Sequence, residues 1–277
     1  MVNILVPTDF SDFSKVAINF AVKVANKLDG NVTLLHVVNI IQPTRSSMRF
    51  MFKTVEQELM DIAKEDFEEL LKDINKQNKT ATPIKYKVSL GTSFNGVLNK
   101  EAKKLRTGLI VMGTRGASGL AKVIVGSNTA SLIDSSNVPV LAVPELAEFK
   151  SFKNIVYATD MVNLDKELKT FLPYAKTFDS MVHVVHVTPS DKNVKAIEEK
   201  IYKAALGKIN YKKFTVNVLV NKKADKAVEE YVDKIKADLV TTFAYEDSFY
   251  KKLFNNRSLA KQMAFQSIVP LLTFKQK

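Results

Sequence analysis

Asn3-Ile4-Leu5-Val6-Pro7-Thr8-Asp9 has a near copy later in the same chain, Asn154-Ile155-Val156-Tyr157-Ala158-Thr159-Asp160. The two segments lie 151 residues apart in a chain of 277 residues, so the repeat indicates a duplicated domain rather than a short motif. In both copies a continuous apolar run precedes Thr-Asp, as is typical of a parallel strand that is buried on both faces. We therefore predict two domains, at residues 1–145 and 151–277, joined by a short linker.

Strand and helix patterns alternate after the first copy of this segment. Apolar strand runs occur near residues 3–7, 32–38, 84–90, 109–112 and 138–143. Helical apolar spacing separates them, at about residues 11–29, 54–74, 97–105 and 127–136. Ser11 or Ser14 can cap the first helix, Gly30 can end it, and residues 39–50 are expected to be a loop.

The second half repeats this order with less regular spacing. Its expected strands lie near residues 155–158, 182–187, 216–220, 239–242 and 269–274, and its expected helices near 168–178, 225–236 and 257–266. Alternating strands and helices give a parallel sheet with right-handed crossovers and helices on both faces. The predicted fold class is α/β, with two tandem, doubly wound, parallel five-stranded sheets of the Rossmann-like type.

The composition is that of a globular protein with a basic surface. The net charge is +12, but only five of the 41 basic residues are arginines and no basic stripe with interleaved aromatics is present, so we expect no nucleic-acid partner. The sequence has no cysteine, no apolar run of about 18–20 residues that could cross a bilayer, and no signal-peptide pattern. These features predict a cytoplasmic protein with no membrane partner, no disulfide bond and no thiolate metal site.

Three glycines follow the predicted fourth strand, at positions 113, 116 and 126. Glycine has no Cβ, so a glycine-spaced backbone can adopt positive φ and wrap closely around a polyphosphate. Ser127-Asn128-Thr129 then opens a helix, whose first N–H groups and dipole favour an anion. Ser127 and Thr129 add hydroxyl donors, and Arg115 in the loop adds positive charge.

The same loop is also compatible with a purely structural role, as a set of turns that precede a helix cap. Its position favours a phosphate-bearing ligand instead. The loop follows a strand at the carboxyl edge of the predicted sheet, where α/β proteins bind ligands, and Thr8-Asp9 and Val37 follow strands at that edge too. The pattern matches neither a Walker loop nor the Rossmann glycine fingerprint.

These motifs resemble those of the universal stress protein family, in tandem form. The nucleotide-binding branch of that family has the signature Gly-x2-Gly-x9-Gly-Ser/Thr, which Gly113, Gly116, Gly126 and Ser127 match. Residues 7–11, 35–37 and 138–141 match as well, and the resemblance is stronger over the first half than over the second. It implies a stress-response protein that binds ATP, or AMP or ADP, with Mg²⁺ held on the nucleotide near Asp9.

The resemblance also implies where the nucleotide lies. Adenine is expected near Asp9 and Val37, the ribose near Pro7 and Gly113, and the phosphates along Gly116 and residues 126–129. The predicted binding residues are Pro7, Thr8, Asp9, Val37, Met112, Gly113, Arg115, Gly116, Gly126, Ser127, Asn128 and Thr129.

Three of these residues have an alternative role. Asp9 either contacts the ligand or its metal ion, or caps the following helix, and the survival of its copy Asp160 favours the ligand. Val37 either offers backbone hydrogen bonds and an apolar face to the ligand, or packs in the core. Met112 belongs either to the core or to the wall around adenine.

The second half lacks the glycines. Residues 243–250, Phe-Ala-Tyr-Glu-Asp-Ser-Phe-Tyr, stand opposite the glycine loop, and Arg257 stands about where Gly126 would be. Bulky side chains prevent close backbone approach, and Glu246 and Asp247 would repel phosphate. We therefore predict nucleotide binding in the N-terminal domain only. The aromatic residues either fill the second cleft or bind a flatter, less charged ligand.

No catalytic residue is identified in the sequence. His183 and His186 point to opposite faces of a predicted strand and cannot share a metal ion, and His36 is equivalent to His186, which indicates packing. No serine stands in a catalytic motif with a histidine base. The predicted function is therefore a nucleotide-responsive regulator with at most slow ATP hydrolysis. The alternative is a non-catalytic scaffold, or a binder of another metabolite, with a vestigial cleft.

The last strand of each half, near residues 138–143 and 269–274, would leave an unpaired sheet edge. Members of the resembled family pair these strands across a dimer axis, so that a duplicated chain can pair them internally. We predict an internal pseudo-dimer, with a homodimer of whole chains as a further assembly.

Cleavage of the linker tests this prediction. A specific protease site placed within residues 145–152 should be cut without separating the halves, because strand pairing buries backbone and apolar groups on both sides. Size-exclusion chromatography of the cut protein should show one species that contains both fragments. Two fragments that elute separately would contradict the pseudo-dimer.

Overall fold

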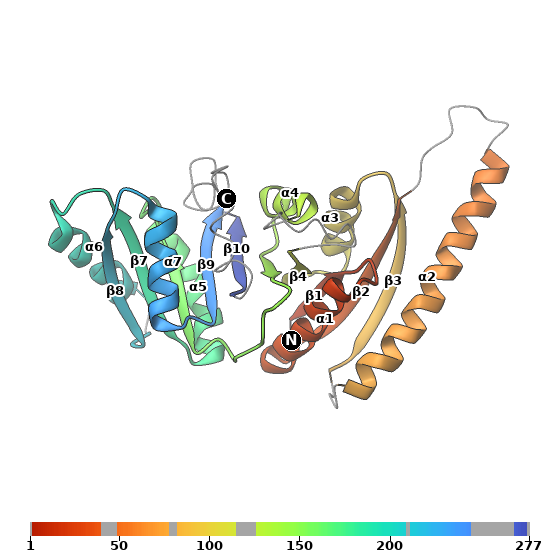
Figure 1. Cartoon of the computed structure of the whole chain (residues 1–277), viewed down its shortest axis with the longest axis horizontal. Helices are drawn as coiled ribbons and strands as arrows, with labels where there is room; N and C mark the ends of the chain where they lie inside the picture. The colour runs from red at the N-terminus through yellow and green to blue at the C-terminus, as the bar shows by residue number, and fades with distance from the viewer. Residues whose placement is uncertain are drawn as a thin grey trace. The chain divides into compact units, whose positions relative to one another are not determined.

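A computed structural model of the chain describes residues 2–39, 49–77, 82–114, 126–208, 211–244 and 269–275. The chain divides into two compact units, Met1–Glu145 and Leu146–Lys277. Each unit is an α/β domain in which helices flank a parallel sheet (Figure 1).

The first unit has strand order β3-β2-β1-β4-β5, and every pairing in it is parallel. Right-handed crossovers then place α1 and α2 on one face of the sheet and α3 and α4, which contact each other, on the opposite face. Its elements are β1 (Asn3–Pro7), α1 (Asp12–Leu28), β2 (Asn31–Asn39), α2 (Arg49–Gln77), β3 (Ile84–Gly91), α3 (Phe94–Lys104), β4 (Leu109–Gly113), α4 (Ser127–Ser135) and β5 (Val140–Val143).

The second unit repeats this topology, with parallel strands in the order β8-β7-β6-β9-β10. Its described elements are β6 (Asn154–Ala158), α5 (Leu164–Phe178), β7 (Met181–Thr188), α6 (Val194–Lys208), β8 (Phe214–Val220), α7 (Ala224–Ile235), β9 (Leu239–Ala244) and β10 (Leu271–Lys275). The predicted fold of two doubly wound five-stranded sheets is confirmed.

Three expectations about the elements need comment. Helix α6 was not predicted, although Val194, Ile197 and Ile201 follow helical spacing. The loop expected at residues 39–50 is wrong at both ends, because Asn39 still belongs to β2 and Arg49 and Phe50 already belong to α2. Residues 40–48 lie outside the described part. The helix expected near 257–266 also lies outside it.

The core of the first unit forms around β1. Ile4, Leu5 and Val6 are at most 1% exposed, because the strand is covered on both faces. Helix α1 packs its small residues Ala17 and Ala21, both fully buried, toward the sheet. Burial of one aliphatic side chain contributes about 1.5–3 kcal/mol, so the apolar run that identifies β1 in the sequence also stabilises it in the fold.

The junction between α1 and β2 differs slightly from the expectation that Gly30 ends the helix, because the C-cap is the preceding residue, Asp29. Asp29 carries the left-handed backbone, with φ 49°, and the N–H of Gly30 donates to the carbonyl of Ala25 at 2.9 Å. A Cβ on Gly30 would lie 2.6 Å from the carbonyl oxygen of Val2. The glycine is therefore required by close backbone approach.

Substitution Gly30→Ala should lower the free energy of unfolding by about 1–3 kcal/mol, the usual cost of overpacking, because the atom in the way is backbone and cannot rotate aside. Gly96→Ala is the control, since there the nearest atom, at 3.3 Å, is the side-chain oxygen of Ser93. Urea denaturation of both variants measures the difference. Equal stability of the two variants would contradict the assignment.

Candidate functional site

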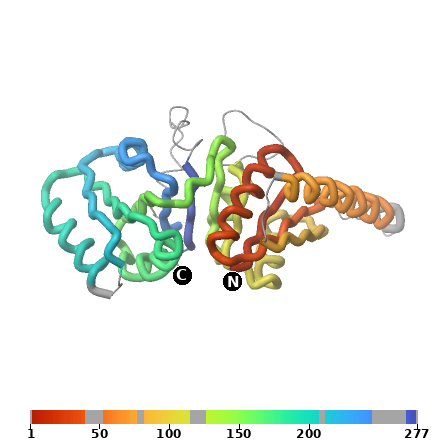
Figure 2. The backbone as a smooth tube through the Cα atoms, turned by 90° about the horizontal axis from the view of Figure 1, so that it is seen from below, coloured from red at the N-terminus to blue at the C-terminus, as the bar shows by residue number. Residues whose placement is uncertain are grey.

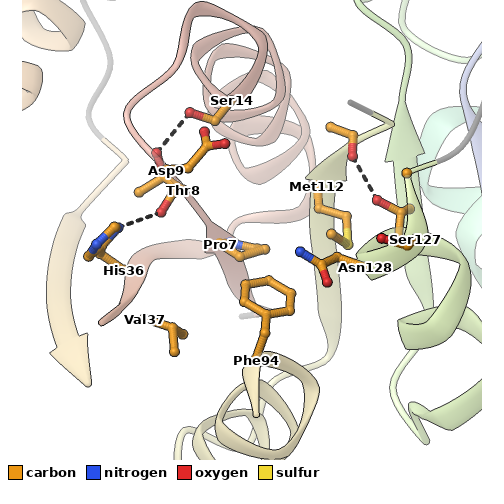
Figure 3. A pocket seen from close by; sticks show the side chains of 13 residues that line it. Pro7, Thr8, Asp9, Ser14, His36, Val37, Phe94, Met112, Ser127 and Asn128 are labelled. Atoms are coloured by element: carbon orange, nitrogen blue, oxygen red, sulfur yellow. Dashed lines mark hydrogen bonds between the residues drawn. The ribbon is translucent and has the colours of Figure 1, made fainter. Parts of the chain in front are cut away.

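A cavity of about 230 Å³ opens at the carboxyl ends of β1 and β4 (Figure 3). The strand order reverses between these two strands, and such a crevice is the usual binding position in open α/β sheets. The lining residues come from the ends of three strands and the starts of three helices: Pro7, Thr8, Asp9, Ser14, His36, Val37, Phe94, Met112, Gly113, Gly126, Ser127, Asn128 and Thr129.

Ten of the twelve predicted binding residues line this one cavity. The other two, Arg115 and Gly116, lie outside the described residues. Sequence reasoning missed three lining residues, Ser14, His36 and Phe94. Ser14 was treated only as a helix cap and His36 only as packing, whereas no pattern in the sequence singles out Phe94.

A tight turn after β1 forms the floor of the cavity. Phe10 has a left-handed backbone, with φ 62°, and its N–H donates to the hydroxyl of Thr8 at 3.0 Å. The ring of His36 donates from Nδ1 to the carbonyl of Thr8 at 2.8 Å, which fixes the tautomer because a carbonyl only accepts. The histidine therefore braces the turn as well as lining the cavity.

The second unit contains the same turn. Met161 has φ 68°, its N–H donates to the hydroxyl of Thr159 at 3.0 Å, and His186 reaches the carbonyl of Thr159 at 2.9 Å. The Thr-Asp pair therefore survives in both copies as part of a shared backbone turn. Asp160 accepts from the N–H of Val162 at 3.1 Å, so the turn itself explains its retention, which does not favour a ligand role for Asp9.

Asp9 supports the start of α1 indirectly. Its Oδ1 accepts from the N–H of Ser11 at 3.2 Å and from the hydroxyl of Ser11 at 2.5 Å. Ser11 is the actual N-cap, since its hydroxyl oxygen accepts from the N–H of Ser14. Asp9 thus does not cap the helix itself, and its exposed carboxylate lies on the cavity wall.

The start of α4 is tied to the end of β4 by two hydrogen bonds. The N–H of Gly126 donates to the carbonyl of Thr114 at 2.6 Å, and the hydroxyl of Thr129 donates to the carbonyl of Gly113 at 2.9 Å. A Cβ on Gly126 would lie 3.2 Å from that Thr114 oxygen. Gly126 has φ −57°, so this glycine serves close approach and not the positive φ that was expected of it.

The backbone N–H groups in the first turn of α4 are not capped by a side chain and have no acidic residue beside them. The N-cap Gly126 makes no side-chain capping bond, and no acidic residue occurs in the first turn. Ser127 and Asn128 are exposed, so the positive end of the helix dipole faces an accessible surface. The hydroxyl of Thr129, which the sequence offers as a ligand donor, donates in the structure to the carbonyl of Gly113, and the residue is only 2% exposed.

The rest of the wall is apolar. Pro7, Val37, Phe94 and Met112 surround the cavity in Figure 3. Val37 is half-buried, whereas Met112 is only 6% exposed. Both residues therefore combine the two roles that the sequence left open, since each packs in the domain and also faces the cavity.

The equivalent edge of the second unit is built differently. Ile4 pairs with Leu109 and Ile155 with Leu239, so counting along β4 and β9 places Phe243 where Gly113 stands. Phe243 is 5% exposed and stacks on Phe274 at 5.0 Å between ring centroids. The side chain of Phe243 therefore packs in the core, which agrees with the prediction that aromatic residues fill the second cleft. Residues 245–250 lie outside the described part.

A buried carboxylate also distinguishes the second unit. The hydroxyl of Thr8 bonds Ser14 in the first unit at 2.9 Å, whereas that of Thr159 donates to Glu167 at 3.3 Å. Glu167 is 1% exposed and also accepts from the hydroxyl of Tyr157, and burial raises the pKa of Glu167. Burial favours the neutral form of this acid, so the two units differ here in packing and hydrogen bonding beneath the turn.

The described residues contain no group of three or more His, Cys, Asp or Glu side chains that could hold a metal ion. No helix in the described ranges is long and apolar enough to cross a membrane.

Comparison with known proteins identifies relatives of both halves. The model of the Universal stress protein family matches residues 1–144. Universal stress protein MJ0531 of Methanocaldococcus jannaschii is 30% identical over 145 residues, which are 50% of this chain and 80% of the relative. Universal stress protein Slr1230 of Synechocystis sp. is 26% identical over 298 residues, covering 99% of this chain and 100% of the relative.

A solved structure supports the fold across the chain. The crystal structure of a universal stress protein from Archaeoglobus fulgidus DSM 4304 has a TM-score of 0.68 and covers 99% of this chain and 98% of its own. The two sequences are 17% identical, so the likeness concerns the fold alone.

The tie between α4 and β4 can be tested by Thr129→Val, which keeps the shape of the side chain and removes the hydroxyl. The variant should lose about 1 kcal/mol of unfolding free energy, because the hydrogen bond to Gly113 is buried. Thr177→Val is the matched control, since its hydroxyl bonds a carbonyl of its own helix in solvent. Urea denaturation that gives equal losses would argue against the tie.

Proposed function

The chain belongs to the universal stress protein family, and we propose that its N-terminal domain binds an adenine nucleotide and acts as a nucleotide-responsive regulator in stress. One observation carries the proposal: a single cavity joins an apolar wall to the uncapped, acid-free start of α4. The apolar wall suits the base of a nucleotide, and the start of α4 suits its phosphates.

The base is assigned to the apolar part of the cavity. Pro7, Val37, Phe94 and Met112 offer flat or flexible apolar surface, on which a purine loses unfavourable contact with water. Backbone groups near Val37 supply the polar edge contacts that the family resemblance implies.

The phosphates are assigned to the start of α4. The N–H groups of the first helical turn have no intrahelical partners, and the helix dipole favours negative charge there. Gly126 keeps the approach open because it has no side chain. Arg115 and Gly116 belong to the same proposed phosphate site on the strength of the sequence signature.

The size of the cavity agrees with this division. Its 230 Å³ is below the roughly 300–1,000 Å³ of typical small-molecule pockets, so part of a nucleotide would lie outside it. The phosphates would then extend over the exposed Ser127 and Asn128. ATP, ADP and AMP all satisfy this arrangement, and Mg²⁺ would be held mainly by the phosphates, close to Asp9.

We assign no nucleotide to the second domain and no catalytic residue to either. Phe243 in place of Gly113 opposes phosphate binding at the equivalent edge, because its side chain prevents the close backbone approach that a glycine allows. In the first domain His36 faces the cavity, but its Nδ1 is held by Thr8. Hydrolysis would depend on water and a metal ion that the nucleotide brings, and should be slow.

Calorimetry of the full chain with ATP and Mg²⁺ tests the proposal. We expect one nucleotide per chain, and a loss of about tenfold in ATP affinity on Asn128→Asp, because a new negative charge would face the phosphates. Adenosine, which has no phosphate, should bind wild type and variant alike. The substitution places an acid at a helix start, which stabilises the helix, so a weakened complex would not reflect unfolding.

Asn75→Asp is the control, since it makes the same chemical change at an exposed position of α2 that does not line the cavity. Absence of any nucleotide binding would favour the vestigial scaffold. If Asn128→Asp lowers the affinity for adenosine as much as the affinity for ATP, the assignment of the phosphates to the start of α4 is contradicted.

A further inference from the structure

Helix α2 has a buried face that is explained by its own domain. Ala63, Phe67, Leu70 and Ile74 are at most 5% exposed, and the helix contacts β2 and β3. In Figures 1 and 2, α2 lies at the outer edge of its unit, and part of it extends past the other elements. One face of the helix is therefore committed to the fold.

A second apolar stripe on α2 is exposed. Val55, Leu59 and Ile62 are 46%, 41% and 54% exposed, and their spacing of four and three residues places them on one helix face. Single exposed apolar residues are ordinary, but an aligned set on a helix marks an interaction surface.

This stripe is flanked by acids. Glu58, Glu65 and Asp66 lie three or four residues from members of the stripe, and all three are exposed. The whole of α2 has eight Asp and Glu against five Lys and Arg, in a chain whose net charge is +12. We call Val55, Leu59 and Ile62 with these three acids the acidic stripe.

The second unit contains a surface of opposite character. A shallow cavity of about 540 Å³ lies between the start of α5 and helix α6. Met161, Val162, Leu164 and Ala204 give it apolar surface, and Val162 is 63% exposed. We call this cavity the lysine groove.

Three lysines, Lys166, Lys200 and Lys203, also line the groove against one carboxylate, Asp165. The N-cap of α5, Asn163, makes no side-chain capping bond, but Asp165 and Glu167 lie in the first turn of that helix, so the positive character of the groove comes from its lysines. The lysine groove therefore has an apolar floor surrounded by cationic side chains, which complements the acidic stripe.

We propose that the acidic stripe of one copy of the chain docks in the lysine groove of a second copy. Apolar residues would meet apolar residues, and the flanking acids would meet Lys200 and Lys203, so both the hydrophobic and the charge pattern are complementary. Neither surface contains a residue of the nucleotide cavity, so the proposal is independent of nucleotide binding.

The contact has two expected properties. It involves about two turns of one helix and a shallow groove, so the interface is small and the affinity weak. It is also heterologous, because two different surfaces meet, and every copy carries one of each. Copies would therefore assemble head to tail, into a closed ring or an open chain.

Sedimentation velocity of the full chain tests the association itself. Mass should rise with protein concentration from about 1 µM to about 1 mM, and the association should weaken at least tenfold between about 50 mM and 500 mM salt, because the ion pairs lie near the surface. A chain that stays monomeric at every concentration at low salt would overturn the proposal.

Two variants then identify the surfaces. The triple substitution Val55→Ser, Leu59→Ser and Ile62→Ser removes the apolar stripe, and Lys200→Glu with Lys203→Glu reverses the groove. Each variant alone should associate at least tenfold more weakly than wild type. An equimolar mixture should form a 1:1 complex and nothing larger, because the first variant keeps an intact groove and the second keeps an intact stripe.

Lys169→Glu with Lys222→Glu is the matched control for charge, since both lysines are exposed and neither lines the groove. It should associate like wild type. Circular dichroism melting confirms that each variant is folded. A mixture of the two surface variants that stays monomeric would overturn the proposal. Unchanged association of either variant alone would overturn it too, and unchanged association of the lysine-groove variant would favour pairing of α2 with α2.

Discussion

The buried strand β1 is the constraint on which the candidate site depends. It pairs with β2 through Pro7 and Leu35 and with β4 through Leu5 and Ile110, and both pairings are parallel. Parallel pairing forces the segments that follow these strands to the same edge, and the reversal of strand order leaves a gap between them. The cavity position therefore follows from a few apolar residues that never touch a ligand. The turn held by Thr8 and His36 then fixes where the chain leaves that edge.

Comparison of the two copies distinguishes residues that the fold requires from residues that a ligand would require. Both copies keep the turn after the first strand, with a left-handed residue and a bracing histidine, so these features belong to the fold. The copies differ at the next strand, where Gly113 is matched by Phe243, and beneath the turn, where the partner of Thr159 is the carboxylate of Glu167. The first change removes space at the edge where a nucleotide would lie, and the second replaces a hydroxyl partner by a buried acid. One topology therefore accommodates different side chains at the edge where α/β proteins bind ligands.

Much of this architecture was predictable from the sequence, because buried parallel strands are continuous apolar runs and because strand ends determine the site. Glycine spacing before a helix likewise identified the α4 end of the cavity. Prediction failed where a tertiary contact decided the role of a residue. Gly30 and Gly126 are required by backbone atoms distant in sequence, the hydroxyl of Thr129 is used by Gly113, and Phe94 reaches the cavity only through the position of α3. The survival of Asp160 has the same kind of cause, since the turn that contains it is held by a histidine from the neighbouring strand.

The net charge of +12 conceals an uneven distribution that bears on both proposals. Residues 1–150 contain 19 basic and 15 acidic residues, and α2 alone holds five and eight of them, which leaves 14 basic and seven acidic residues for the rest of that half. The part of the domain that carries the cavity is therefore clearly basic, which favours an anionic ligand, while α2 is acidic and amphipathic. A uniform lysine-rich surface would only confer solubility. Segregation of charge within one domain instead agrees with both proposals, an anionic ligand at the cavity and a cationic partner at α2.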